Sequence, residues 1–142
     1  MIDQVSVFLE NQKGRLAAAT QAIADAGINM HSLYVADTAE YGVVRLLCDE
    51  PQTAAKKLFD AGWRATATPV VAVRIPDEVG SLARLLAVLD ESNINLEYAY
   101  CISTDGGHAV DVLKVTDTAG VEETLSAAGF EPLTSKDLYI AE

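Results

Sequence analysis

The sequence is poor in cysteine and in positive charge. Cys48 and Cys101 are its only cysteines among 142 residues, too few and too far apart for a disulfide framework or a metal-binding knuckle. The sequence has 10 Lys and Arg residues and 21 Asp and Glu residues, which gives a net charge of −11. A chain this acidic repels phosphate backbones and anionic lipids. We therefore expect no nucleic-acid partner and no membrane partner, and the cysteines give us no reason to expect a metal site.

Long hydrophobic runs are also missing. None approaches the roughly 20 apolar residues that a helix needs to cross a bilayer, and the N-terminus lacks the basic flank and apolar stretch of a signal peptide. Half of the residues are nevertheless hydrophobic, enough for the core of one ordinary domain or of two very small ones. We expect a soluble, acidic, cytoplasmic protein.

What the sequence does contain is an internal repeat. A shift of 66 residues aligns QVSVFLENQKGRLA with VVAVRIPDEVGSLA and gives 11 identities in the 43 positions of residues 5–47. One residue is inserted later, so that AGW at 61–63 aligns with AGF at 128–130 at a shift of 67. Two copies are fewer than a solenoid array uses. The repeat predicts a duplicated small domain, with residues 1–69 and 70–142 as the two copies.

Each copy is predicted to run strand, helix, strand, strand, helix, strand. In the first copy, β-branched and apolar runs predict strands at 5–9, 30–36 and 43–48, with a hairpin around 39–42. Apolar residues at helical spacing predict helices at 16–26 and 52–61; Gly27 ends the first and Pro51 fits the first turn of the second. The second copy repeats this with strands at 70–75, 96–103 and 108–115, a hairpin at Asp105-Gly106-Gly107, helices at 81–92 and 121–128, and a last strand at 137–140. This order predicts an α+β fold of two ferredoxin-like βαββαβ modules in tandem, each an antiparallel sheet with its helices on one face.

Several function classes hosted by this architecture lack their signature here. The first loop has no cysteine pair for a metal, the chain has no P-loop and no dinucleotide-binding glycine motif, and the acidic balance disfavours RNA. The only histidines, His31 and His108, fall on strands of different copies and have no nucleophile at a meaningful spacing. We expect ordinary surface or inter-copy roles for both, buried packing roles for the two cysteines, and no enzymatic activity. A small enzyme that uses His31 or His108 is the weaker alternative.

The loop between the first strand and the first helix stands out in both copies. It has the form [N/D]-x-x-G-x-L, followed later by I-N-hydrophobic at the start of the second strand. Glycine lets the backbone pass close to a ligand, the helix offers free N–H groups to a carboxylate, and Asn or Asp can accept from an ammonium group. A free α-amino acid carries both groups. The alternative is purely structural, since Asn and Asp often cap helices and glycine permits turns.

These residues resemble those of ACT domains, the small-molecule sensing modules attached to many enzymes of amino-acid metabolism, and nearly the whole chain resembles a stand-alone tandem ACT protein. The resemblance implies that a ligand lies between the loop of one module and the second strand of its neighbour. Carried over by position, the implied ligand-binding residues are Asn11, Lys13, Gly14, Arg15, Leu16, Asn29, Asp77, Val79, Gly80, Ser81, Leu82 and Asn95. Serine-sensing members have a His two residues before the loop Asn, where this chain has Leu9 and Ile75, so the resemblance does not extend to serine specificity.

The resemblance implies a non-enzymatic, amino-acid-binding regulatory protein without a cofactor, acting in trans on an enzyme or transporter of amino-acid metabolism. We expect a homo-oligomer, because a second copy covers the exposed edge strands of such sheets. The first loop carries Lys13 and Arg15 and the second carries Asp77 and Glu78, so we expect tighter carboxylate binding at the first. The alternative from a different class is a ligand-free adaptor that keeps the fold for protein–protein contact.

Overall fold

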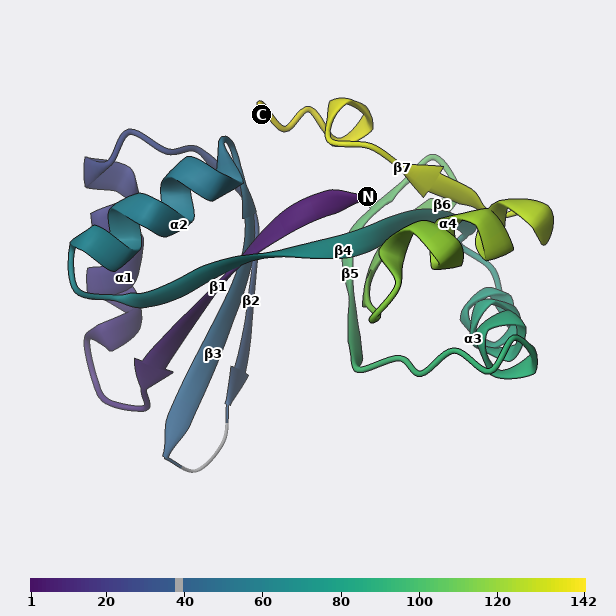
Figure 1. Cartoon of the computed structure of the whole chain (residues 1–142), viewed down its shortest axis with the longest axis horizontal. Helices are drawn as coiled ribbons and strands as arrows, with labels where there is room; N and C mark the ends of the chain where they lie inside the picture. The colour runs from purple at the N-terminus through teal and green to yellow at the C-terminus, as the bar shows by residue number, and fades with distance from the viewer. Residues whose placement is uncertain (38–39) are drawn as a thin grey trace. The chain divides into compact units, whose positions relative to one another are not determined.

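The chain forms two compact units in the computed structural model, which describes residues 1–37 and 40–142 (Figure 1). The N-terminal unit contains Asp3–Thr68 and takes in the last four residues, Tyr139–Glu142. The C-terminal unit contains Pro69–Leu138 and takes in Met1–Ile2. Each unit therefore includes a short piece from the opposite end of the chain. None of the described helices is both long and apolar enough to span a bilayer.

The N-terminal unit has the predicted βαββαβ order. Its elements are β1 (Ile2–Glu10), α1 (Arg15–Asp25), β2 (Met30–Asp37), β3 (Tyr41–Cys48), α2 (Pro51–Asp60) and the first part of β4 (Arg64–Pro76). Its strand order is β2-β3-β1-β4, and α1 and α2 lie on one face of the sheet (Figure 1). Alternate residues of β1, namely Val5, Val7 and Leu9, pack with Ile23 of α1 and Leu58 of α2 because successive strand residues face opposite sides.

The C-terminal unit repeats the same plan. Its elements are the second part of β4, α3 (Ser81–Glu91), β5 (Tyr98–Asp105), β6 (His108–Lys114), α4 (Thr118–Ala127), β7 (Glu131–Leu133) and a 3₁₀ turn, η1 (Lys136–Leu138). The strand order β5-β6-β4-β7 is that of the first unit copied element for element. Val71 and Val73 of β4 pack with Leu85 of α3 and Leu125 of α4. The predicted fold class, two ferredoxin-like modules in tandem, is confirmed.

One strand serves both units. β4 has 13 residues, of which Arg64–Thr68 belong to the N-terminal unit and Pro69–Pro76 to the C-terminal unit. The sequence analysis placed the first strand of the second copy at 70–75 and did not place the fourth strand of the first copy. The two are a single extended segment, so Pro69 lies within a strand.

The predicted last strand at 137–140 is wrong. The strand in this position of the repeat is β7, and the residues after it form η1. The Asp137 carboxylate accepts hydrogen bonds from the backbone N–H and the hydroxyl of Thr134, both at 2.8 Å, and the Asp137 N–H donates back to the Thr134 carbonyl. Such local side-chain-to-backbone bonds compete with strand pairing.

The strand register relocates the insertion between the copies. Glu10 of β1 pairs with Tyr41, whereas its equivalent Pro76 of β4 pairs with His108. The shift is therefore already 67 in β3 and β6. Tyr34 and Tyr100, at a shift of 66, pair with Arg45 and Val112, and the β5 register then skips from Cys101 to Ser103. The extra residue is therefore Ile102, at the bulge in β5. The predicted hairpin around 39–42 includes Ala39, which lies outside the described residues, and Gly42 belongs to β3.

Two further predictions need correction. Cys101 is exposed, not buried, because it lies on β5, the edge strand of its sheet, whereas Cys48 is fully buried as expected. The helix predicted at 121–128 begins three residues earlier, at Thr118, because the Asp117 carboxylate caps it by accepting from the Gly120 N–H at 3.0 Å.

Candidate functional site

The first predicted loop joins β1 to α1 and is anchored to the start of a neighbouring strand. The Asn11 N–H donates a hydrogen bond to the Glu40 carbonyl at 3.2 Å. Gly14, directly before α1, has φ 86°, a left-handed conformation that glycine adopts without steric cost. The side chains of Asn11 and Lys13 are exposed beside it. The loop therefore presents both its backbone and its polar side chains to solvent.

The second loop, between β4 and α3, repeats this construction. The Asp77 N–H donates to the Gly107 carbonyl at 2.8 Å, the equivalent bond from loop to hairpin. Gly80 stands directly before α3 with φ 88°. Val79 is fully exposed between them. The same loop geometry in both units indicates that it belongs to the repeated fold.

Neither helix that follows these loops is capped by a side chain. The N-cap residues of α1 and α3 are the two glycines, and no side chain hydrogen-bonds there. The explanation of Asn11 and Asp77 as helix caps is therefore wrong, in contrast to Asp117, which does cap its helix. The first N–H of each helix donates to a loop carbonyl, Arg15 to Gln12 and Ser81 to Glu78, both at 3.2 Å. The next N–H groups of the first turn have no intrahelical acceptor, so the two N-termini present positive, hydrogen-bonding ends to an anion.

Ser81 begins α3 and is the one buried residue among the predicted site positions, at 2% exposure. Its hydroxyl has no hydrogen-bond partner in the part of the chain that the structure describes. An unpaired buried hydroxyl costs about 1–3 kcal/mol. In the first unit the equivalent residue is the exposed Arg15. The two loops therefore differ in polarity where the helix starts.

An aromatic ring contacts Arg15, one of the two basic side chains at the first loop. The guanidinium carbon of Arg15 lies 4.8 Å from the centroid of the Trp63 ring, in cation–π contact. Sequence reasoning missed Trp63, although the alignment of AGW with AGF places an aromatic residue there in both copies. Leu16 and Leu82, predicted next to the glycines, are 39% and 49% exposed and offer apolar surface at both loops.

The two asparagines predicted to face the ligand lie at the other end of the helices. An 11-residue helix, about 16 Å long, separates the Gly14 loop from Asn29 and the Gly80 loop from Asn95 in the same unit. Within one unit, each asparagine is thus not brought together with its own loop. The backbone carbonyl of Asn29 accepts from the Asp49 N–H at 3.0 Å, which continues the pairing of β2 with β3 beyond Met30 and Cys48.

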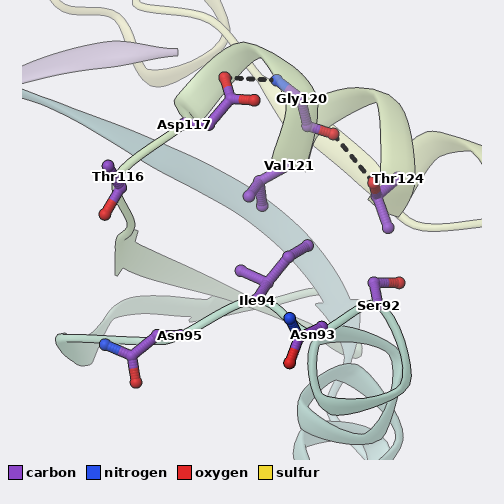
Figure 2. A pocket seen from close by; sticks show the side chains of 9 residues that line it. All are labelled: Ser92, Asn93, Ile94, Asn95, Thr116, Asp117, Gly120, Val121 and Thr124. Atoms are coloured by element: carbon purple, nitrogen blue, oxygen red, sulfur yellow. Dashed lines mark hydrogen bonds between the residues drawn. The ribbon is translucent and has the colours of Figure 1, made fainter.

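Asn95 lines a pocket of about 460 Å³ between the C-terminal end of α3 and the N-terminal end of α4 (Figure 2). The pocket is lined by Ser92, Asn93, Ile94, Asn95, Thr116, Asp117, Gly120, Val121 and Thr124. Figure 2 shows Ile94 and Val121 pointing toward one another across it. Asp117 accepts from the Gly120 N–H, and the Thr124 hydroxyl donates to the Gly120 carbonyl at 2.9 Å. Polar groups on the α4 side of the pocket are therefore occupied in organising the helix.

His31 is engaged in a structural contact that the sequence analysis did not find. Its Nε2 hydrogen-bonds with Asp49 Oδ1 at 2.7 Å, and the same oxygen accepts from the Ala141 N–H at 2.8 Å. The Glu50 N–H in turn donates to the Ala141 carbonyl at 2.7 Å. The histidine and the tail amide together hold the pKa of the Asp49 carboxyl below its usual value. This network fixes the C-terminal tail to the N-terminal unit. No sequence signal connects residues 92 positions apart.

His108 and the two cysteines are the remaining side chains that the sequence suggested as reactive groups. His108 begins β6 and lines a second, smaller pocket. Burial raises the pKa of the Cys48 thiol to about 11, which makes it inert at neutral pH. Within the described ranges, no group of three or more His, Cys, Asp or Glu side chains is placed to hold a metal ion.

Comparisons with known proteins agree with this fold. The family model described as an ACT domain pair matches residues 1–140. The crystal structure of protein BT0572 from Bacteroides thetaiotaomicron is similar, with a TM-score of 0.87 and 31% identity over 97% of this chain and 95% of that one. The regulatory subunit of aspartate kinase from Thermus thermophilus, in its ligand-free form, has the same fold, with a TM-score of 0.62 and 17% identity over 89% and 91% of the two chains.

The corresponding subunit from Thermus flavus gives a TM-score of 0.61 at 17% identity, over 89% of this chain and 92% of that one. A search of curated proteins gives no match. The family match covers nearly the whole chain, and both units have the loop, glycine and strand order on which the resemblance was based. The chain belongs to the family of ACT domain pairs.

Proposed function

We propose that this protein binds a free α-amino acid and acts as a non-enzymatic regulator. The observation that carries the proposal is the pair of uncapped helix N-termini, each directly behind a left-handed glycine. The first-turn N–H groups suit the ligand carboxylate, and the side chains of Asn11 and Asp77 suit its ammonium group. Membership of the ACT domain-pair family supports a regulatory role, and similar folds include proteins named as regulatory subunits of aspartate kinase.

The two loops are proposed to bind with unequal affinity. Lys13 and Arg15 favour a carboxylate at the first loop, whereas Asp77 and Glu78 disfavour it at the second. The contact with Trp63 holds Arg15 beside the helix start, which reduces the side-chain freedom lost on binding. Calorimetric titration should resolve a tight and a weak site. Two equal affinities would contradict this assignment.

The regulatory output is proposed to act in trans on an enzyme or transporter of amino-acid metabolism. A ligand that binds one arrangement of the protein better than another shifts the population between them, and a partner can read that shift. β2 is an edge strand in the N-terminal unit and β5 is an edge strand in the C-terminal unit. We propose that a second copy of the chain covers such an edge strand. Light scattering with and without ligand measures both the oligomeric state and its response.

The test is thermal unfolding of the purified protein with each of the twenty amino acids at millimolar concentration. A ligand present at 100 times its dissociation constant adds about 2.7 kcal/mol of stability, a readily measured shift. One or two amino acids should raise the melting temperature, and calorimetry should confirm saturable binding. A flat panel from a well-folded protein would refute amino-acid binding.

A ligand-free adaptor is the second candidate. Phe8, Tyr34 and Tyr41 lie on the sheet face of the N-terminal unit opposite the helices and are 49%, 42% and 54% exposed. Exposed aromatic side chains on one face are typical of protein–protein contacts. A flat amino-acid panel, combined with a native complex that Phe8→Ser disrupts, would favour the adaptor over the sensor.

A further inference from the structure

Three basic side chains gather at one small pocket of the C-terminal unit. The pocket has a volume of about 230 Å³, and Arg74, Arg84 and His108 line it together with the turn that leads into β7. Among the described residues that line it, the acidic one is Glu131, and the Asp137 carboxylate lies near enough to Arg74 to interact with it electrostatically. In a chain with 10 Lys and Arg residues against 21 Asp and Glu residues, this is a local reversal of the overall charge.

The basic groups come from three elements that converge at one end of the unit. Arg74 lies near the end of β4, Arg84 in the second turn of α3, and His108 at the start of β6, where it pairs with Pro76. Within the part of the chain that the structure describes, neither Arg84 nor His108 makes a side-chain hydrogen bond or ion pair. Arg84 and His108 thus both line the pocket without a described side-chain partner.

Arg74 already binds a carboxylate there. Its Nη1 donates to Glu131 Oε1 at 3.1 Å and to Oε2 at 3.0 Å. The two side chains are 37% and 61% exposed, and such exposed pairs contribute little to stability. The Glu131 carboxylate is therefore an anion that a solute anion could displace from Arg74 at small cost.

The fold itself does not require these charges. In the N-terminal unit the residues equivalent to Arg74, Arg84 and His108 are Phe8, Ala18 and Tyr41, by the shifts of 66 and 67 that the strand register defines. The equivalent of Glu131 is Arg64, so the carboxylate is also specific to the second copy. Both units form the same sheet and helices, so the cluster is an addition to one copy.

We propose that this pocket binds a small phosphate-type oxyanion, either the free ion or a phosphate group on a small molecule. Two guanidinium groups and an imidazole N–H supply donors from three directions, which suits the several acceptor oxygens of a tetrahedral oxyanion. Among the described lining residues, Arg74 and Arg84 against Glu131 leave a net positive charge. The pocket shares no lining residue with either glycine loop, although the Arg84 N–H donates to the Gly80 carbonyl at 2.9 Å, so this site adjoins the second loop and is distinct from the proposed amino-acid site.

The experiment is a titration of the full chain with inorganic phosphate, followed by calorimetry and by the NMR signals of the His108 ring, with ionic strength held constant by chloride. Arg84→Ala should weaken binding about tenfold or more, the loss expected for one charge-assisted contact. Glu131→Gln should tighten binding severalfold, because it removes the competing carboxylate. Arg64→Ala removes another exposed arginine, away from this pocket, and should change the affinity less than twofold.

Circular dichroism of each variant confirms that it is folded. Saturable binding that Arg84→Ala weakens and Glu131→Gln strengthens supports the site. Equal losses in Arg84→Ala and Arg64→Ala would show general charge attraction and overturn it. Absence of saturable binding to the wild-type chain, or no gain in Glu131→Gln, would also overturn it.

Discussion

Replacement of Gly14 by alanine separates ligand contact from folding. Gly14 has φ 86°, and an added Cβ would meet no atom within 4 Å, so the substitution introduces backbone strain and no clash. A left-handed conformation costs an L-residue about 1–2 kcal/mol. Gly27, in the same unit, has φ 73° and equally open surroundings, but it lies at the opposite end of α1. Gly27→Ala is therefore a control with matched strain.

Both variants should lose about 1–2 kcal/mol of unfolding free energy in urea denaturation. Only Gly14→Ala should weaken binding of the amino acid found in the thermal panel, because its Cβ projects where the ligand approaches the loop backbone. Isothermal calorimetry on both variants measures this difference. Normal binding by Gly14→Ala would refute the backbone-approach argument, as would an equal loss of affinity in Gly27→Ala.

Three further outcomes follow from contacts in the N-terminal unit and from the thiols. Truncation after Leu138 removes Ile140, which is 6% exposed, and should destabilise the N-terminal unit by about 1.5–3 kcal/mol in urea denaturation; a loss near zero would mean that the tail does not pack there. The pKa of Asp49 is lowered in the folded protein from its usual 3.8, so its ionised form contributes stability above that pH, and the contribution disappears as the pH falls through the folded pKa. Asp49→Asn should therefore be less stable than the wild type at pH 6 and equally stable at strongly acidic pH, as urea titrations at several pH values can measure. Ellman's reagent should modify the exposed Cys101 in the folded protein and reach Cys48 only on unfolding, because the pKa of that buried thiol is about 11; two fast thiols would contradict this.

Most of the fold could be predicted because its signals are local. Alternating apolar residues, helical spacing and glycine or proline at the expected ends identified the repeated helices and strands. The errors arose where a local rule had a competitor. The strand predicted at 137–140 failed because Asp137 and Thr134 bond to each other's backbone. The insertion was misplaced because Val44 and Leu47 match residues of the second copy by chance at the wrong shift.

The positions of the candidate loops could be predicted for the same reason, but the hydrogen bonding and burial of their side chains could not. The repeated [N/D]-x-x-G-x-L pattern located both loops. It could not tell that Asn11 and Asp77 leave the helix ends uncapped, because capping depends on side-chain geometry as well as residue type. Nor could it show that the Ser81 hydroxyl is buried without a partner.

The sequence by itself determined that this protein is a duplicated βαββαβ module with a glycine loop before the first helix of each copy, since periodicity, turn residues and self-alignment are all properties of the chain read in order. Only the tertiary structure decided that the last residues dock beside Asp49, that Trp63 lies under Arg15, and that basic residues of three elements share one pocket. These contacts join residues far apart in sequence. They depend on strand register, in which a shift of one residue turns every side chain to the opposite face of the sheet.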